Sequence, residues 1–250
     1  MTEQAEYARR CLATTMSGMD PEYHSWLLSE EVAVPANSVR DPEWMREQIR
    51  LRGLIWNTED TRVLATLWWY SASARMIAPT IASLVITGEP LSPELDDLWL
   101  HNKPDSRLSG VTSTAVLPVP SNDTTTATYE TAAPVLATLG AALHKLFAAV
   151  IPAVAAAGHM RERPLWALAT DAIAGRLLWA GEACGDVERA SSMAEPLVAA
   201  VNGPMPAPRY TQRATDDRMV TKRVSCCLLY RAPGQHKCRG CPGKPPAERN

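Results

Sequence analysis

The chain has 250 residues, 46% hydrophobic and 21% charged, which is enough apolar material for a sizeable core and excludes a largely disordered protein. Its formal net charge is −2, from 25 Lys and Arg against 27 Asp and Glu, so its overall charge does not favour binding to nucleic acid. At this length we expect one domain, or one domain with a small appendage.

Prolines and glycines divide the first two thirds of the chain into predicted helices. Asp41 followed by Pro42 is typical of an N-cap and the first turn of a helix, which Gly53 is expected to end. A long apolar run over residues 59–86 follows, in which Pro79 predicts a kink or a split. The aromatic residues in this run are expected to face the core.

Three more helical segments are expected, over residues 130–157, 164–184 and 187–201. The first is long and apolar enough to span a bilayer by length alone. It carries Lys145 near its centre, and a central Lys costs about 2.5–3.5 kcal/mol on insertion scales. We therefore expect a buried core helix and no transmembrane segment.

Short strands are expected at residues 98–100 and 110–119, on either side of a polar turn at 102–106. A proline-rich break then divides a helical body, residues 1–203, from a C-terminal segment, residues 204–250. The predicted fold class is mainly α with a small β-sheet (α+β).

The positive charge is concentrated in the C-terminal segment. Ten Lys and Arg but only three Asp and Glu lie between Arg209 and Arg249, so this stretch carries +7 and the rest of the chain −9. An acidic body with a basic end indicates that the end meets something anionic. The alternative at this point is a basic tail that is merely solvated.

The cysteines are clustered in the same segment. The N-terminus lacks the apolar core of a secretory signal, so we expect a reducing compartment, where clustered cysteines are more often metal ligands than disulfides. Four of the six have the spacing Cys-Cys-x10-Cys-x2-Cys. The six are Cys11, Cys184, Cys226, Cys227, Cys238 and Cys241. The first two are expected to be small buried hydrophobic residues.

Four thiolates within 16 residues match the ligand set of one [2Fe–2S] cluster. The second pair, Cys238 and Cys241, has the spacing of a tight turn around one metal ion. The first pair, Cys226 and Cys227, can share a site only if the backbone bends there, since neighbouring residues of a regular strand point to opposite faces. The Pro-Gly turn at residues 233–234 would fold the second pair back onto the first.

Other interpretations of the cysteines remain open at this point. A structural zinc site also uses four cysteines, although usually as two Cys-x2–4-Cys units, and an adjacent Cys-Cys pair fits that pattern poorly. A disulfide is disfavoured by the expected compartment. Unliganded buried cysteines would not be gathered among lysines and arginines. The residues favour the cluster without excluding zinc.

The motif also resembles a known family. SCCLLYR followed by Cys-x-x-Cys-Pro, within Arg223–Pro242, resembles the C-terminal iron–sulfur segment of the FhuF-like ferric-siderophore reductases. The resemblance implies an oxidoreductase, cytoplasmic or peripheral to the inner face of the membrane, whose [2Fe–2S] cluster reduces Fe(III) in a siderophore, expected to be of hydroxamate type, and releases Fe(II). It also implies the ligands. These are Cys226, Cys227, Cys238 and Cys241.

Basic residues around the motif are candidates for tuning the cluster or docking an acidic electron carrier, because positive charge favours the more negative reduced cluster. They are Arg223, Arg231, Lys237 and Arg239. In the body, Arg75 and His101 are candidates for contacting the substrate.

Neither G-x-G-x-x-G after a strand nor G-x-x-x-x-G-K-[ST] occurs in the sequence, and nothing suggests flavin. We therefore expect a separate ferredoxin- or flavodoxin-like electron donor. Two alternatives to a reductase remain: an iron–sulfur protein that senses redox state or iron without turnover, and a zinc-stabilised scaffold.

Overall fold

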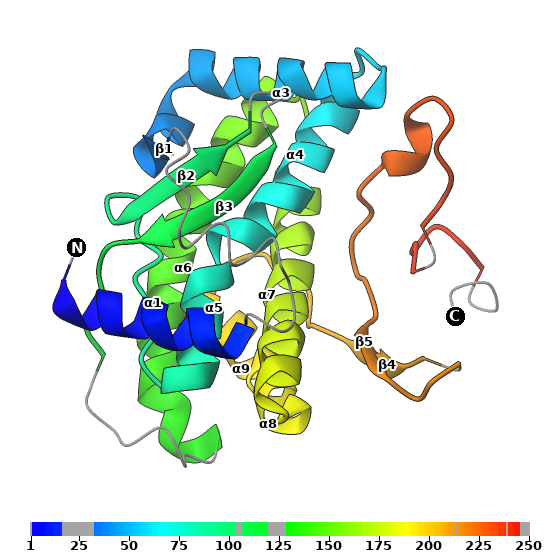
Figure 1. Ribbon diagram of the computed structural model, residues 1–250. Coiled ribbons are helices and arrows are strands. Elements are labelled where there is room, and N and C mark those ends of the chain that lie inside the picture. The colour runs from blue at the N-terminus through cyan, green and yellow to red at the C-terminus, as the bar shows by residue number, and fades with distance from the viewer. Residues whose placement is uncertain are drawn as a thin grey trace.

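The computed structural model describes residues 2–16, 33–103, 107–119, 129–213, 215–238 and 240–245. This part of the chain is mainly helical with two small antiparallel sheets, which confirms the predicted fold class (Figure 1). The helices are α1 (Glu3–Met16), η1 (Ala36–Arg40), α3 (Pro42–Trp56), α4 (Thr61–Met76), α5 (Ala78–Thr87), α6 (Tyr129–Ala157), α7 (Arg163–Cys184), α8 (Val187–Ser192), α9 (Ala194–Val201) and η2 (Leu229–Arg231). The strands are β1 (Ala33–Pro35), β2 (Leu98–Asn102), β3 (Leu108–Ser113), β4 (Tyr210–Gln212) and β5 (Met219–Thr221).

Helix α3 begins where the sequence predicts and ends later. The Asp41 carboxylate accepts a hydrogen bond from the Glu43 N–H at 2.8 Å, as an N-cap does. The prediction that Gly53 ends the helix is wrong, since α3 continues to Trp56. Gly53 instead lets the backbone at Thr58 pack close to the helix, because a Cβ at residue 53 would lie 2.9 Å from the Thr58 carbonyl oxygen.

Prolines set two of the helix boundaries. Pro79 lies in the first turn of α5, and the apolar run over residues 59–86 is split into α4 and α5 as predicted. The prediction of a single helix over residues 187–201 is wrong. This stretch forms two helices, α8 and α9, with a break at Met193. Pro196 accounts for the break, because a proline ring clashes with the carbonyl four residues earlier.

Helices α4, α6 and α7 share an aromatic core. Trp69, Phe147 and Trp166 pack edge to face in sequence, with ring centroids 6.0 and 6.1 Å apart, and the Trp69 indole N–H donates to the Leu165 carbonyl at 2.9 Å. The expectation that the aromatic residues of the 59–86 run face the core fails for Tyr70, whose side chain is 44% exposed.

The predicted strand pair is present with a shifted second strand. β2 and β3 are antiparallel, and β3 covers Leu108–Ser113 instead of residues 110–119. The tip of the predicted turn, residues 104–106, lies outside the described residues. The sequence did not predict β1, which pairs with β2 and completes a three-stranded sheet of order β1-β2-β3.

Helix α6 contains the one stretch of the described chain, Ala133–Ala157, that is long and apolar enough to cross a membrane by length and composition. Just over half of that stretch, 56%, is buried inside the molecule, as expected of a core helix. Lys145 reaches the surface, where its ammonium pairs with Glu94 at 3.1 Å.

The C-terminal segment lies on one side of the helical body. After α9 the chain forms the β4–β5 hairpin, and β5 packs against α7. From the hairpin the segment runs along the side occupied by α4 and α7, and η2 contacts α4 (Figure 1). The C-terminal segment is therefore held against the body at β5 and at η2.

Candidate metal centre

A buried carboxylate on α7 holds the backbone that enters the Cys-Cys pair. Asp171 accepts hydrogen bonds from the Val224 N–H at 2.9 Å, the Ser225 N–H at 3.1 Å and the Ser225 hydroxyl. The Asp171 side chain is only 8% exposed. Because two backbone donors converge on one carboxylate, the direction of the chain at Cys226 is fixed relative to α7.

The backbone bends directly after the first cysteine pair. A bend is needed if two neighbouring cysteines are to bind the same metal centre. Leu228 adopts the left-handed conformation, with φ 59° and ψ 8°, at a cost of roughly 1–2 kcal/mol for a residue with a Cβ. Cys227 is buried in an apolar group with Val63 and Leu67 of α4. Packing against α4 thus keeps one cysteine of the pair inside the molecule.

The second cysteine pair folds back onto the first. The Gln235 N–H donates to the Ala232 carbonyl at 3.1 Å across the predicted Pro-Gly turn, in which Gly234 has φ 71°. The Cys241 N–H donates to the Cys238 carbonyl at 3.1 Å, which closes the tight turn of the second pair.

Contacts join the two pairs to each other. The Arg223 guanidinium Nη1 lies 3.7 Å from the Cys227 sulfur and 3.5 Å from the Cys238 sulfur, and Cys241 lies near enough to Cys226 to raise the pKa of that thiol. Arg223 thus bridges one cysteine of the first pair and one of the second. All four sulfurs therefore belong to one small region.

Burial raises the pKa of two of the four thiols, those of Cys226 and Cys238. It raises the pKa of Cys226, which the neighbouring Cys241 raises further while a hydrogen bond from the Leu228 N–H lowers it. Burial also raises the pKa of Cys238, and Arg223 opposes that shift. A cation and a backbone N–H are thus already directed at sulfur, where they would stabilise a thiolate.

Arg223 has the surroundings expected beside an anionic group. Its side chain is 13% exposed, its Nε lies 3.7 Å from an Asp171 carboxylate oxygen, and its guanidinium lies 4.7 Å from the centre of the Tyr70 ring. Burial alone lowers the pKa of Arg223, but Tyr70, Cys227 and Asp171 together raise it above its usual value. Its Nη2 is buried and has no hydrogen-bond partner among the described residues. Such a donor fits a cluster with four thiolates, which is net negative.

The four motif cysteines match the number of thiolates that a [2Fe–2S] cluster takes. In the part of the chain that the structure describes, no group of three or more His, Cys, Asp or Glu is placed to hold one metal ion. A structural zinc site needs four ligands around one point, whereas a [2Fe–2S] cluster takes two thiolates on each of two irons. The arrangement of the four cysteines as two pairs is compatible with a [2Fe–2S] cluster.

The other basic residues proposed for tuning have different surroundings. Arg231 pairs with Asp60 at 3.2 Å, and its side chain is 44% exposed. The Lys237 ammonium donates to the Gly243 carbonyl at 2.8 Å and lies 5.7 Å from the centre of the Tyr230 ring. Arg239 lies outside the described residues. Among the three described candidates, Arg223 is the one in contact with the cysteine sulfurs.

The two substrate-contact candidates lie in different parts of the fold. Arg75 donates to the Ser71 hydroxyl at 3.0 Å on α4 and lines a cavity that Arg223 also lines. His101 is buried in β2, where its Nε2 is hydrogen-bonded to the Thr112 hydroxyl at 3.0 Å, and it does not line that cavity. The structure brings only Arg75 close to the cysteine region.

Two residues of the centre were missed from the sequence, Asp171 and Tyr70. Asp171 is the one acidic residue among the apolar residues between Arg163 and Gly181. A single acid in a buried helix is a sequence signal for a carboxylate that binds a buried polar partner. Tyr70 adjoins two tryptophans in the sequence and carries no comparable signal. The prediction that Cys184 is a buried hydrophobic residue is wrong, because its side chain is exposed.

Arg231 provides a test of the proposed tuning. Arg231→Glu should lower the midpoint potential of the cluster by roughly 40 mV or less, since a half-exposed charge interacts by on the order of 1 kcal/mol at most. Arg223→Gln should lower it more, because Arg223 is buried and touches sulfur. Redox titration followed by electron paramagnetic resonance measures both shifts. Equal potentials in the wild type and both variants would rule out tuning by these residues.

Comparison with protein families agrees with the motif. Residues 223–242 match the family model described as the FhuF 2Fe-2S C-terminal domain, and no curated protein matches the chain. The match covers the Cys-Cys pair, the turn, the Cys-x-x-Cys pair and the proline that follows. It therefore confirms the resemblance over this segment: the chain carries a FhuF-type iron–sulfur domain at its C-terminal end, and its cofactor is a [2Fe–2S] cluster.

Proposed function

We propose that the protein reduces Fe(III) in ferric siderophores by one electron and releases Fe(II). A single observation carries the proposal: a FhuF-type cysteine motif whose contacting arginine, Arg223, also lines an open cavity. The body, residues 1–203, would hold the substrate, and residues 204–250 would form the cluster-binding segment. The hydroxamate class implied by the resemblance stays a prediction.

Four cysteines would hold the cofactor. They are Cys226, Cys227, Cys238 and Cys241. When bound, a [2Fe–2S] cluster accepts and donates one electron at a time, which matches the Fe(III)/Fe(II) step. Asp171 keeps the Cys-Cys backbone in position, and Arg223 offsets negative charge beside the sulfurs.

Reduction alone is sufficient for iron release. Hydroxamate and catecholate oxygens are hard donors that bind Fe(III) far more tightly than Fe(II), so one added electron weakens every metal–oxygen bond together. No bond within the siderophore has to break. The protein needs to bring the ferric complex near the cluster and supply the electron.

The electron must come from another protein. We propose an acidic ferredoxin- or flavodoxin-like donor that docks on the basic C-terminal segment, where Arg231 and Lys237 lie near the cysteines. Docking of this kind weakens as salt is added. We propose a cytoplasmic location, or one peripheral to the inner face of the membrane, because such donors and the released Fe(II) are used there.

The dependence on a donor is testable. The isolated protein should not oxidise NADPH with a ferric siderophore present, whereas addition of a ferredoxin and its reductase should start Fe(II) formation. Absorbance of NADPH and of a ferrous chelator follows both steps, and the donor system without the protein is the control. Rapid NADPH oxidation by the isolated protein would falsify the dependence.

A further inference from the structure

A groove beside the cysteine region is built differently from a larger cavity elsewhere in the described chain. It has a volume of about 440 Å³, within the range of ~300–1,000 Å³ that is usual for small-molecule sites. Its walls come from α4, α7 and the end of β5. Arg223 lines it and also touches the sulfurs of Cys227 and Cys238, so a ligand here would be separated from the sulfurs by one side chain.

The groove is positively charged. Three guanidinium groups line it, those of Arg75, Arg176 and Arg223, against a single carboxylate, that of Asp171. That carboxylate already accepts the hydrogen bonds of the Cys-Cys backbone. The groove therefore favours an anion, and it favours the anion more strongly after the anion has gained an electron.

The groove also has aromatic walls. Tyr70 lies beneath the Arg223 guanidinium at 4.7 Å, and Trp179 lies beneath that of Arg176 at 4.9 Å. Stacked arginine–aromatic pairs offer flat faces with positive charge close by. Aryl rings that carry anionic oxygens suit such walls, whereas aliphatic hydroxamates have no ring to stack.

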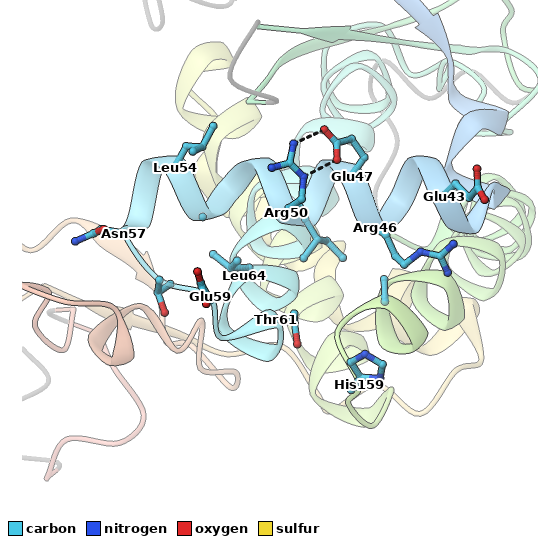
Figure 2. Close-up of a pocket in the computed structure, with 14 residues that line it drawn as sticks. Glu43, Arg46, Glu47, Arg50, Leu54, Asn57, Glu59, Thr61, Leu64 and His159 are labelled. Carbon is cyan, nitrogen blue, oxygen red and sulfur yellow. Dashed lines mark hydrogen bonds and ion pairs between the residues drawn. The ribbon is translucent and has the colours of Figure 1, made fainter.

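The larger cavity, about 1,320 Å³, lies between α3, the start of α4 and the end of α6 (Figure 2). Three glutamates and two arginines line it, and one of these arginines, Arg50, is held by Glu47 through two hydrogen bonds of 2.7 Å. None of the four motif cysteines lines it. Its charge and its lining do not favour an anionic ligand close to the cluster.

We propose that the smaller groove binds an anionic ferric chelate of the catecholate class. The inference rests on the proposed function and, for this groove, departs from the hydroxamate class that the resemblance implies. Arg223 lines the groove and touches the sulfurs of Cys227 and Cys238, so it would contact both the bound chelate and the ligands of the cluster. One electron passes from the reduced cluster to Fe(III), which becomes Fe(II), and the cluster returns to its oxidised state. The separate donor supplies the next electron.

Binding can be tested without reduction by using Ga(III) complexes, which have the size and charge of the Fe(III) complexes and are not reduced. Isothermal titration calorimetry on the cluster-loaded protein should show the tris-catecholate complex, of charge 3−, binding at least about tenfold more tightly than the desferrioxamine B complex, of charge 1+. A Ga(III)–citrate complex, anionic but without rings, should bind with intermediate affinity. Equal affinity for the first two complexes would overturn the proposal.

Variants locate the site. Arg176→Glu should weaken tris-catecholate binding by about tenfold or more, and Arg176→Lys should stay within about threefold of the wild type. The matched control is Arg46→Glu, the same charge reversal in the larger cavity, which should change binding by less than twofold. The visible spectrum of the cluster verifies that each variant is folded. Equal losses in Arg176→Glu and Arg46→Glu would overturn the assignment.

The groove assignment and the reductase proposal can be contradicted separately. If the Ga(III) complexes bind as expected but no Fe(III) complex is reduced, the groove assignment stands and the reductase proposal is wrong. If only a cationic chelate is reduced, and Arg176→Glu does not slow its reduction, the groove assignment is wrong and the reductase proposal stands.

Discussion

Serine in place of any one of the four motif cysteines should remove or shift the visible absorption of the protein. A [2Fe–2S] cluster held by cysteines alone takes four thiolates, and an alcohol is a much weaker ligand for iron at neutral pH. Iron content should fall from about two atoms per chain toward zero. The positions to substitute are Cys226, Cys227, Cys238 and Cys241.

The remaining cysteines provide matched controls. Cys184 is exposed at the end of α7, and Cys11 is half-buried in α1. Cys184→Ser and Cys11→Ser should keep the spectrum and the iron content of the wild type. The ligand assignment fails if Cys184→Ser loses the cluster while a variant of one of the four motif cysteines keeps it.

Asp171→Ala should cause the largest loss outside the cysteines. It removes the shared acceptor of the Val224 and Ser225 N–H groups and leaves the buried Arg223 without its carboxylate. Breaking a buried pair of this kind costs about 3–5 kcal/mol. The variant should lose its cluster at least about tenfold faster than the wild type, measured as the decay of visible absorption in the presence of an iron chelator.

Two further variants separate anchoring from charge. Asp171→Asn keeps one oxygen acceptor without the charge and should lose the cluster at an intermediate rate. Glu182→Gln alters another acid of α7, one that pairs with Arg218 at 2.7 Å on the hairpin side, and should behave as the wild type does. A cluster in Asp171→Ala as durable as in the wild type would show that the carboxylate does not position the segment.

Local chemistry made much of the fold predictable. Pro79 and the Asp41-Pro42 pair placed helix boundaries because a proline lacks an N–H and an aspartate caps free N–H groups. β1 could not be predicted, because a strand of three residues has no detectable period and forms only by pairing with β2, more than sixty residues later. The break at Met193 was predictable in principle from Pro196.

The candidate site likewise has features that the sequence predicts and features that it does not. The cysteine spacing and the turn at residues 233–234 are local, so the sequence could indicate the cluster and the return of the second pair. Asp171 meets the Cys-Cys backbone across more than fifty residues, and Tyr70 meets Arg223 across an even longer stretch. Contacts of that length depend on how α4 and α7 pack, which no spacing in the sequence encodes.

The central claim is that the reduced cluster delivers its electron to siderophore-bound Fe(III), and single-turnover mixing tests it most directly. Protein reduced anaerobically and freed of reductant is mixed with a ferric siderophore, with and without a ferrous chelator, while cluster absorbance is recorded. Catecholate and hydroxamate complexes are compared. We expect the cluster to reoxidise and about one Fe(II) to be trapped per cluster, and we expect the reaction to go further when the chelator removes the product. A cluster that stays reduced with every ferric siderophore, chelator present, would contradict it and favour a protein that senses redox state without turnover.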